Sequence, residues 1–297
     1  GSSVLNYMQY VRGNSKDYDN WGVNGWSYED VLPFFKKSED VAVKGLDTSS
    51  YHGVGGELTV SSIPTPHPLS KAFVRACDSR GIKKNADYNG KEQLGASISQ
   101  TTTKNGIRMS TAKAFLRPLI GKRPNLTVAT GAQVLRVLFD GEDQFTAECK
   151  REKPERKRAE TAPAPRASGV LLQRQEGSFH ARKDYFVHAK REVILCAGAV
   201  GSPHLLLLSG VGPAEHLSEH GIEVVSDVPG VGKNLQDHLM VLVGHDARIP
   251  TMGKNTATLK NLLKWKLLGN GPLASTGLET AAFIKTGKSA ELNVPDV

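Results

Sequence analysis

The stretch that most constrains the fold of this chain is residues 192–212, which read Glu-Val-Ile-Leu-Cys-Ala-Gly-Ala-Val-Gly-Ser-Pro-His-Leu-Leu-Leu-Leu-Ser-Gly-Val-Gly. A short apolar run, Val193–Ala197, is typical of a buried strand, and a turn of small residues follows it. Ser202 is a residue type that commonly caps a helix N-terminus, and Pro203 favours the first helical turn. The pattern therefore predicts a strand, a glycine turn and a helix that begins at Pro203.

The predicted helix is apolar on nearly every face at Leu205–Leu208, so we expect it to be buried, and Gly210 is suited to end it. Backbone N–H groups at the N-terminus of such a helix are placed where a phosphate-bearing ligand could bind. An ordinary tight strand–helix turn explains the same pattern without a ligand. These residues alone leave both interpretations open.

A second block lies at residues 1–19, which read Gly-Ser-Ser-Val-Leu-Asn-Tyr-Met-Gln-Tyr-Val-Arg-Gly-Asn-Ser-Lys-Asp-Tyr-Asp. Together with residues 201–212, this block closely resembles the two signature motifs of the glucose–methanol–choline (GMC) family of flavin oxidoreductases. The positions that fit the first motif are Ser2, Ser3, Asn6, Tyr10, Gly13 and Asp19. The positions that fit the second are Gly201, Ser202, Pro203, Leu205, Leu206, Ser209, Gly210 and Gly212. Two long matches in the expected order are far more specific than one glycine pattern.

The resemblance implies an α/β plus α+β fold, namely an FAD/NAD(P)-binding Rossmann-like GMC fold with the start of an antiparallel-sheet substrate domain. It places residues 1–240 in the FAD-associated region and residues 241–297 at the beginning of the substrate domain. The chain has no Gly-x-Gly-x-x-Gly, which in the family lies upstream of the first motif. The family's proton-accepting His lies near the C-terminus. We therefore expect a central fragment, incomplete at both ends, with the catalytic residues C-terminal to Val297.

The resemblance also implies that FAD is the cofactor. Val134 would pack at the adenine end of FAD, although a plain core valine is the commoner role for this residue type. Some family members carry a His that is bonded covalently to the flavin, but no His occurs between residues 1 and 51, so we expect non-covalent FAD. A buried turn with a Met and Tyr core is the alternative for the first motif. The residues expected to wrap the flavin side of FAD are Ser2, Asn6, Tyr7, Met8 and Gln9.

In the family, the flavin takes a hydride from a carbon that bears a hydroxyl group while a His removes the hydroxyl proton. The implied function is therefore an FAD-dependent oxidoreductase acting on CH–OH groups of a small alcohol or sugar, with oxygen or a quinone as electron acceptor. The fragment alone would be inactive. Residues 6–14 and 25–33 look most like glucose-dehydrogenase-like members from arthropods. The alternative is a truncated, non-catalytic derivative that acts, if at all, as a binding or interaction protein.

The distribution of charge, the lack of long apolar runs and the cysteine content limit which partners and ligands we expect. The chain has a net charge of +8, but residues 150–191 alone contain 12 Lys plus Arg and 5 Asp plus Glu, a net of +7. Because the excess lies in one segment, we expect no nucleic-acid partner. No apolar run approaches the ~20 residues that span a bilayer. Three scattered cysteines predict neither a disulfide framework nor a metal site.

Three further segments have recognisable patterns. Residues 151–168 are rich in Lys, Arg, Glu, Pro and Ala, which predicts a disordered basic insertion in a hairpin loop. Ser27-Tyr28-Glu29-Asp30 is a capping-box start for a helix that reaches about Glu39. Residues 257–268 have the spacing of an amphipathic helix. Because the chain begins inside a motif, the sequence leaves the cellular compartment open.

Overall fold

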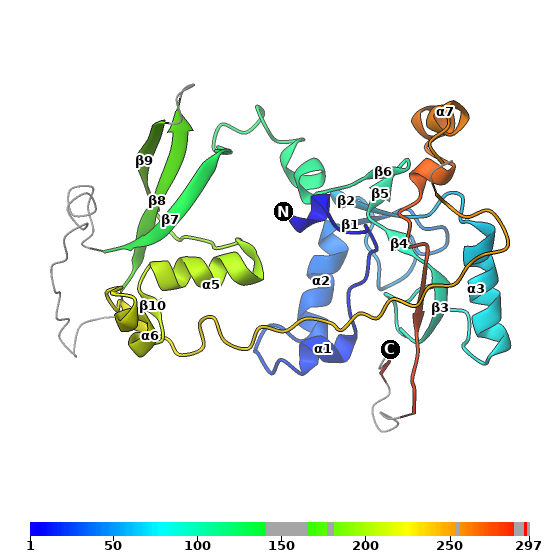
Figure 1. Cartoon of the computed structure of the whole chain (residues 1–297), viewed down its shortest axis with the longest axis horizontal. Coiled ribbons are helices and arrows are strands. Elements are labelled where there is room, and N and C mark those ends of the chain that lie inside the picture. Colours follow the sequence, from blue (N-terminus) through cyan, green and yellow to red (C-terminus); the bar gives the residue numbers. More distant parts are fainter. Residues whose placement is uncertain (141–164, 177–180, 254–255, 288–293, 296–297) are drawn as a thin grey trace. The chain divides into compact units, whose positions relative to one another are not determined.

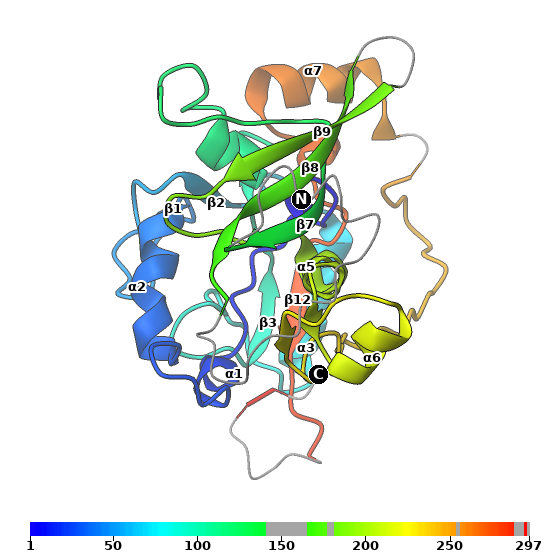
Figure 2. The same ribbon diagram turned by 90° about the vertical axis from the view of Figure 1, so that its left-hand side faces the viewer.

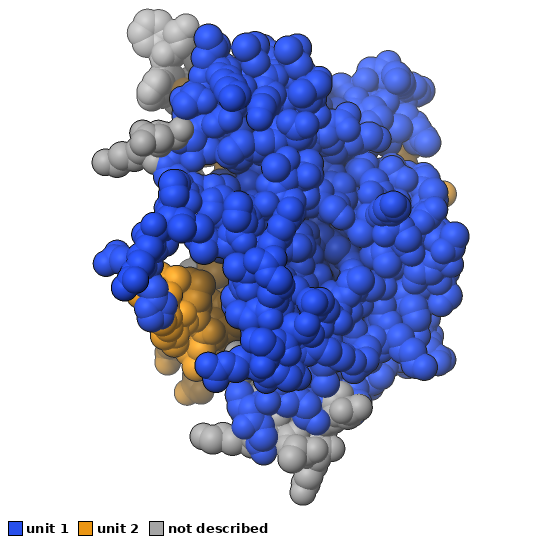
Figure 3. Space-filling view, turned by 90° about the vertical axis from the view of Figure 1, so that its right-hand side faces the viewer, with its two compact units in different colours: residues 1–126, 245–297 blue, residues 127–244 orange. Residues whose placement is uncertain are grey.

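The computed structural model describes residues 1–140, 165–176, 181–253, 256–287 and 294–295. These residues form two compact units, which Figure 3 distinguishes by colour. Unit 1 comprises residues 1–126 and 245–297, and unit 2 comprises residues 127–244. We describe each unit by itself. The predicted division into residues 1–240 and 241–297 stays a prediction.

Short strands make up the sheets of unit 1. They are β1 (Glu39–Val41), β2 (Leu58–Ser62), β3 (Gly95–Ile98), β4 (Gln100–Thr101), β5 (Thr103–Lys104), β6 (Ile107–Arg108) and β12 (Thr280–Phe283). β1 runs parallel to β2, which pairs with β4 in antiparallel fashion. β5 and β6 form a hairpin, and β12 pairs antiparallel with β3. The last pairing brings together two segments that are far apart in the sequence.

Helices surround these strands (Figure 1). They are the 3-10 turn η1 (Ser2–Val4), α1 (Ser15–Asp19), α2 (Tyr28–Ser38), α3 (Pro68–Ser79), the π-helical turn η2 (Ala112–Leu116), α7 (Leu259–Leu268) and the 3-10 turn η4 (Pro272–Ala274). The predicted capping box of α2 is confirmed, because Ser27 and Asp30 cap each other's backbone N–H groups. The amphipathic helix predicted at residues 257–268 is also confirmed, as α7.

The core of unit 1 combines apolar and polar side chains. Val60, Tyr88 and Ala96 are almost completely buried, and the Tyr88 ring packs against Phe283, with 5.5 Å between the ring centroids. Arg12 and Glu39, which carry charge, are buried in the same unit. Buried charges are stable only when they are paired, so these residues direct attention to the interactions around them.

Unit 2 is a three-stranded antiparallel sheet with one helix packed against it. The strands are β7 (Ala132–Phe139), β8 (Ala167–Glu176) and β9 (Ala181–His188), in that spatial order, and Figure 2 presents them toward the viewer. The helix, α5 (Gly198–Leu208), lies against β7. Ser209, directly after it, accepts a hydrogen bond from the backbone N–H of Val137 at 2.8 Å. The described part of this unit also contains a short helix, α6 (Ala214–Glu219), and the parallel strands β10 (Val211–Gly212) and β11 (Ser226–Asp227).

The predicted basic insertion, residues 151–168, falls between β7 and β8. Residues 151–164 lie outside the described residues. The predicted end of the insertion was wrong, because Ala167 and Ser168 already belong to β8. The pairing of Phe139 with Ala167 extends the ladder to this point, and backbone pairing overrides a composition that favours a loop.

Two predictions for residues 192–212 were wrong. α5 begins at Gly198 with Ala197 at its N-cap, one turn before Pro203, because the Ser202 hydroxyl accepts from the Ala197 N–H and supports the added turn. No strand forms at Val193–Ala197 in the described chain, since a strand needs a neighbour for its backbone hydrogen bonds and none pairs with it here. Gly210 follows the end of α5 with a φ of 79°, as predicted.

The predicted burial of the leucine run is also only partly correct. Leu205 is buried, whereas Leu208 is 43% exposed. A helix that packs on one face of a sheet buries only one stripe of its side chains. Because Leu205–Leu208 point to nearly every side of the helix, some of these leucines stay exposed within unit 2.

Candidate functional site

The first motif forms an exposed strip of chain in unit 1, residues 2–9, which we call the N-terminal segment. It starts in η1, where the backbone N–H groups of Leu5 and Asn6 both donate to the Ser2 carbonyl at 2.8 Å. Apolar side chains project from it, since Leu5 is 83% and Tyr7 67% exposed. A fixed backbone that leaves large apolar side chains uncovered is a feature of ligand-binding surfaces.

Side-chain hydrogen bonds fix the conformation of the N-terminal segment. Arg108 on β6 donates through Nη1 to the Asn6 Oδ1 at 2.7 Å and to the Ser3 carbonyl at 3.0 Å. Thr111, just before η2, donates its backbone N–H to the Ser3 Oγ at 3.2 Å. Elements about a hundred residues further along the chain therefore hold the first motif in place.

Met8 has a φ of 63°, a left-handed conformation that is uncommon for a residue with a long side chain. Its carbonyl accepts from the Thr102 N–H at 2.8 Å, and its own N–H donates to Asn6 Oδ1 at 3.2 Å. Beside it, the Gln9 Nε2 donates to the Ser99 Oγ at 2.9 Å. Such backbone strain, held by surrounding hydrogen bonds, is concentrated at ligand-binding and catalytic sites.

Val134 lies in unit 2, on β7. It pairs with Leu172 across the sheet, is half-buried, and directly precedes a register irregularity between Val134 and Arg136. Ser2, Asn6, Tyr7, Met8 and Gln9 thus lie together in one continuous segment of unit 1. That Val134 meets the same ligand stays a prediction.

Four side chains form what we call the buried ionic network: Arg12, Glu39, His52 and Asp87. Its first member, Arg12, closely follows the N-terminal segment in the sequence. The Arg12 Nη2 is 2.7 Å from the Glu39 Oε2. The His52 Nδ1 lies 3.1 Å from Glu39, and its Nε2 lies 2.9 Å from Asp87. The side chains of Arg12, Glu39 and His52 are essentially inaccessible to solvent, whereas that of Asp87 is 19% exposed. With His52 protonated, two positive charges face two carboxylates.

The network determines the protonation state of His52. Burial by itself would lower the pKa of His52, but the hydrogen bonds from Asp87 and Glu39, and their negative charge, outweigh it and raise this pKa to about 9. Burial would raise the pKa of Asp87, whereas the hydrogen bond and charge of His52 lower it below its ordinary value. His52 is therefore a cation at neutral pH, and both ring N–H groups donate to carboxylates.

Neutral side chains connect the network to the backbone that follows the N-terminal segment. Asn89 accepts from the Arg12 N–H at 2.9 Å and donates to the Tyr10 carbonyl at 2.9 Å. Gln100 accepts from the Tyr10 N–H at 2.8 Å through its carbonyl and donates to Asp87 at 3.2 Å through its side chain. Asn89 and Gln100 therefore hold the backbone at Tyr10–Arg12 in place through hydrogen bonds.

Sequence reasoning missed this network and also Arg108, Thr102 and Thr111. Arg12 lies inside the first motif, but its partners follow at irregular intervals over the next 75 positions, so no local spacing indicates that they meet. Glu and Asp side chains are also usually found at the solvent-exposed surface, so their types do not predict a buried cluster. A positional signal exists only for Arg12.

Two absences concern only the part of the chain that the structure describes. There, no cluster of His, Cys, Asp and Glu side chains is suited to hold a metal ion. Likewise, none of the described helices has the length and apolar character needed to cross a bilayer.

The N-terminal segment is suited to a ligand with a planar apolar ring and polar edges. Tyr7 and Leu5 offer uncovered apolar area, and the small Ser2 lets a ligand approach the backbone. The backbone there is fixed in advance by Arg108 and Thr102, which reduces the ordering cost of binding. An isoalloxazine ring has this combination of ring and edges, so the residues present fit the predicted flavin.

Comparison with known proteins gives the chain's relationships. A sequence model of GMC oxidoreductase matches residues 1–240. The chain is 39% identical to the oxygen-dependent choline dehydrogenase of Burkholderia ambifaria over 296 aligned residues, which cover 96% of this chain and 46% of that protein. The chain therefore spans about half the length of the curated relatives that it matches.

Solved structures agree with this relationship. Pyridoxine 4-oxidase from Mesorbium loti superposes with a TM-score of 0.64 at 30% identity, covering 80% of this chain and 41% of that one. An FAD-dependent oxidoreductase from Chaetomium thermophilum shares the fold, with a TM-score of 0.74 at 24% identity over 96% of this chain and 48% of that one. The predicted GMC fold is confirmed. The chain belongs to the GMC oxidoreductase family, whose members are FAD-dependent.

Proposed function

We propose that this chain is part of an FAD-dependent oxidoreductase that acts on the CH–OH group of a small alcohol or sugar. In that reaction the flavin supplies the acceptor for a hydride. The observation that carries the proposal is the N-terminal segment, in which the first family motif is exposed, apolar and fixed from behind by Arg108 and Thr102.

We propose a role for each of the six residues expected to bind FAD. Ser2 lets the ring approach the backbone, and Tyr7 offers it apolar contact area. Asn6 and Met8 give the segment its shape, through the hydrogen bonds to Arg108 and Thr102. Gln9 ties the end of the segment to Ser99. Val134 is proposed to contact the adenine end.

Non-covalent binding of FAD is part of the proposal. The first His of the chain is His52, and both of its ring nitrogens are hydrogen-bonded to buried carboxylates. Neither nitrogen is free to form a bond to a flavin. This geometry removes His52 as a covalent attachment point, which supports the proposal of non-covalent FAD.

The test of the flavin site is a visible absorption spectrum of the purified chain after FAD is added and the excess is removed by gel filtration. We expect the chain to bind FAD weakly, giving a weak retained flavin band that is weakened further in Asn6→Ala. Asn24→Ala, which changes another exposed Asn outside the segment, is the matched control. Equal retention by both variants would show that the segment does not bind the flavin.

The test of the activity is dye-linked oxidation of alcohols, with choline first because of the name of the 39% identical relative, followed by glucose. We expect the 297-residue chain to turn over none of them, since the proton-accepting His is expected beyond Val297. Turnover by this chain would contradict that assignment. A folded chain that retains no flavin would mean that flavin binding and the chemistry belong to a longer protein of which this chain is a part.

A further inference from the structure

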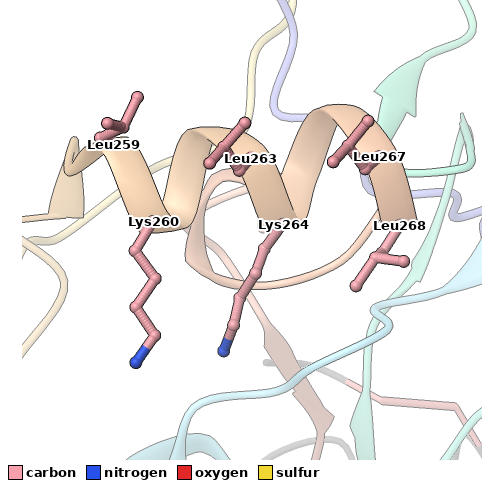
Figure 4. A pocket seen from close by; sticks show the side chains of 6 residues that line it. All are labelled: Leu259, Lys260, Leu263, Lys264, Leu267 and Leu268. Atoms are coloured by element: carbon pink, nitrogen blue, oxygen red, sulfur yellow. The ribbon is translucent and has the colours of Figure 1, made fainter.

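The outer face of α7 carries an apolar ridge that the described residues of unit 1 leave exposed. Leu259, Leu263 and Leu267 follow one another at intervals of four residues, and Figure 4 shows them aligned on one side of the helix. Leu259 is 73% and Leu267 75% exposed. The residues that line this region all come from α7, so it is an open face of one helix rather than an enclosed pocket.

The opposite side of α7 is attached to unit 1. The Trp265 Nε1 donates to the Gly106 carbonyl, in the turn of the β5–β6 hairpin, at 2.8 Å. Thr258 caps the first turn by accepting from the Asn261 N–H at 3.2 Å, and Gly269 ends the helix with a φ of 62°. The ridge is therefore presented by a helix that is capped at its start and attached to unit 1 through Trp265.

Lysines border the leucine ridge on both flanks. At 3.6 residues per turn, Lys260 and Lys264 lie to one side of the ridge and Lys266 to the other. Figure 4 shows Lys260 and Lys264 extending away from the leucines. α7 contains no acidic residue, and the nearby hairpin adds an exposed Lys104 and an Ile107 that is 45% exposed.

The spacing argues against a coiled-coil partner. A coiled-coil seam repeats every 3.5 residues, so a seam through Leu259 and Leu263 would continue at position 266. That position is Lys266. A leucine ridge flanked by lysines, whose long stems let the charged ends reach outward, is instead the pattern of a helix that lies in a membrane interface.

We propose that the outer face of α7 binds the surface of an anionic lipid bilayer. The leucine ridge enters the boundary between headgroups and acyl chains, and Lys260, Lys264 and Lys266 contact the headgroup phosphates and carboxylates. With 10 residues, α7 is about 15 Å long, which is too short to cross the ~30 Å hydrocarbon core, so it lies in the plane of the membrane. The proposal is independent of the flavin site.

Vesicle sedimentation tests the proposal. We expect the 297-residue chain to sediment with phosphatidylcholine vesicles that contain phosphatidylserine, and much less with phosphatidylcholine alone. Added salt should release it, because salt screens the attraction between surface charges. Lys260→Gln with Lys264→Gln should weaken binding about fivefold for each lysine. Equal sedimentation with both kinds of vesicle would overturn the proposal.

Leucine variants separate the ridge from general stickiness. Leu263→Ser with Leu267→Ser should abolish sedimentation, whereas Leu235→Ser, which changes a leucine as exposed as Leu259, should leave it unchanged. Circular dichroism verifies that each variant is folded. If the leucine variants do not fold, the lysine variants still test the proposal. Absence of vesicle binding, or self-association that depends on Leu263, would overturn the proposal in favour of another occupant.

Discussion

The N-terminal segment and the residues that follow it differ sharply although they are continuous in sequence. Residues 2–9 expose apolar side chains and hold Met8 in a strained conformation. Tyr10–Arg12 are clamped by Asn89, Gln100 and the buried ionic network. The comparison indicates that the exposed N-terminal segment can keep one conformation because the residues that follow it, Tyr10–Arg12, are held in place.

A second contrast shows why burial matters to this arrangement. Arg12–Glu39 and Lys84–Asp78 are ion pairs with similar separations, 2.7 and 2.9 Å, but the first is inaccessible to solvent and the second is about half exposed. Removing one partner of a buried pair leaves an uncompensated charge, whereas water compensates an exposed one. Variants of the two pairs therefore test the role of the network.

The largest effect is expected for Glu39→Ala. This change leaves Arg12 and His52 buried with one carboxylate fewer, which should reduce the free energy of unfolding by about 3–5 kcal/mol. Urea unfolding followed by tryptophan fluorescence measures it, because all three tryptophans lie in unit 1. Asp78→Ala is the exposed control. Equal losses in the two variants would contradict the special role of the buried pair.

The next effect is a dependence of stability on pH. The pKa of His52 is about 9 in the folded chain against an ordinary 6.5, so its stabilising contribution is complete below pH 6.5 and is lost as pH rises through 9. The expected loss of unfolding free energy is about 3 kcal/mol. Urea unfolding across this range measures it. His52→Gln should flatten the profile, and an unchanged profile would refute the assignment to His52.

A smaller effect is expected where the N-terminal segment meets its support. Arg108→Gln removes the charge-assisted hydrogen bond to Asn6. Because this bond is exposed to solvent, its loss should weaken FAD retention by only about fivefold, or ~1 kcal/mol. The flavin absorption retained after gel filtration measures this. Arg117→Gln, an exposed arginine on another turn, is the control. Unaltered retention would mean that the segment's shape is not needed for binding.

The smallest effect is expected for Lys84→Ala, which removes the exposed partner of Asp78. The unfolding free energy should change by less than about 1 kcal/mol, because solvent and salt screen this pair. The same urea titration measures it. A loss comparable with that of Glu39→Ala would erase the contrast between buried and exposed pairs.

Local chemistry predicted several elements correctly. The capping box at Ser27, the glycine after α5 and the amphipathic pattern at residues 257–268 all act through neighbours within a few positions. The start of α5 was wrong because Ser202 serves Ala197 from inside the helix instead of capping Pro203. Such a choice between two local hydrogen bonds depends on how the whole helix packs.

The sequence by itself determined the family relationship and the position of the first motif, because both are properties of residues at fixed spacing. Only the tertiary structure decided which charges are buried. Arg12, Glu39, His52 and Asp87 meet through β1 and the loops that precede β2 and β3, and long-range contacts of this kind leave no trace in local periodicity. The same holds for α7, whose pattern predicted an amphipathic helix, while packing through Trp265 decided which leucines remain exposed.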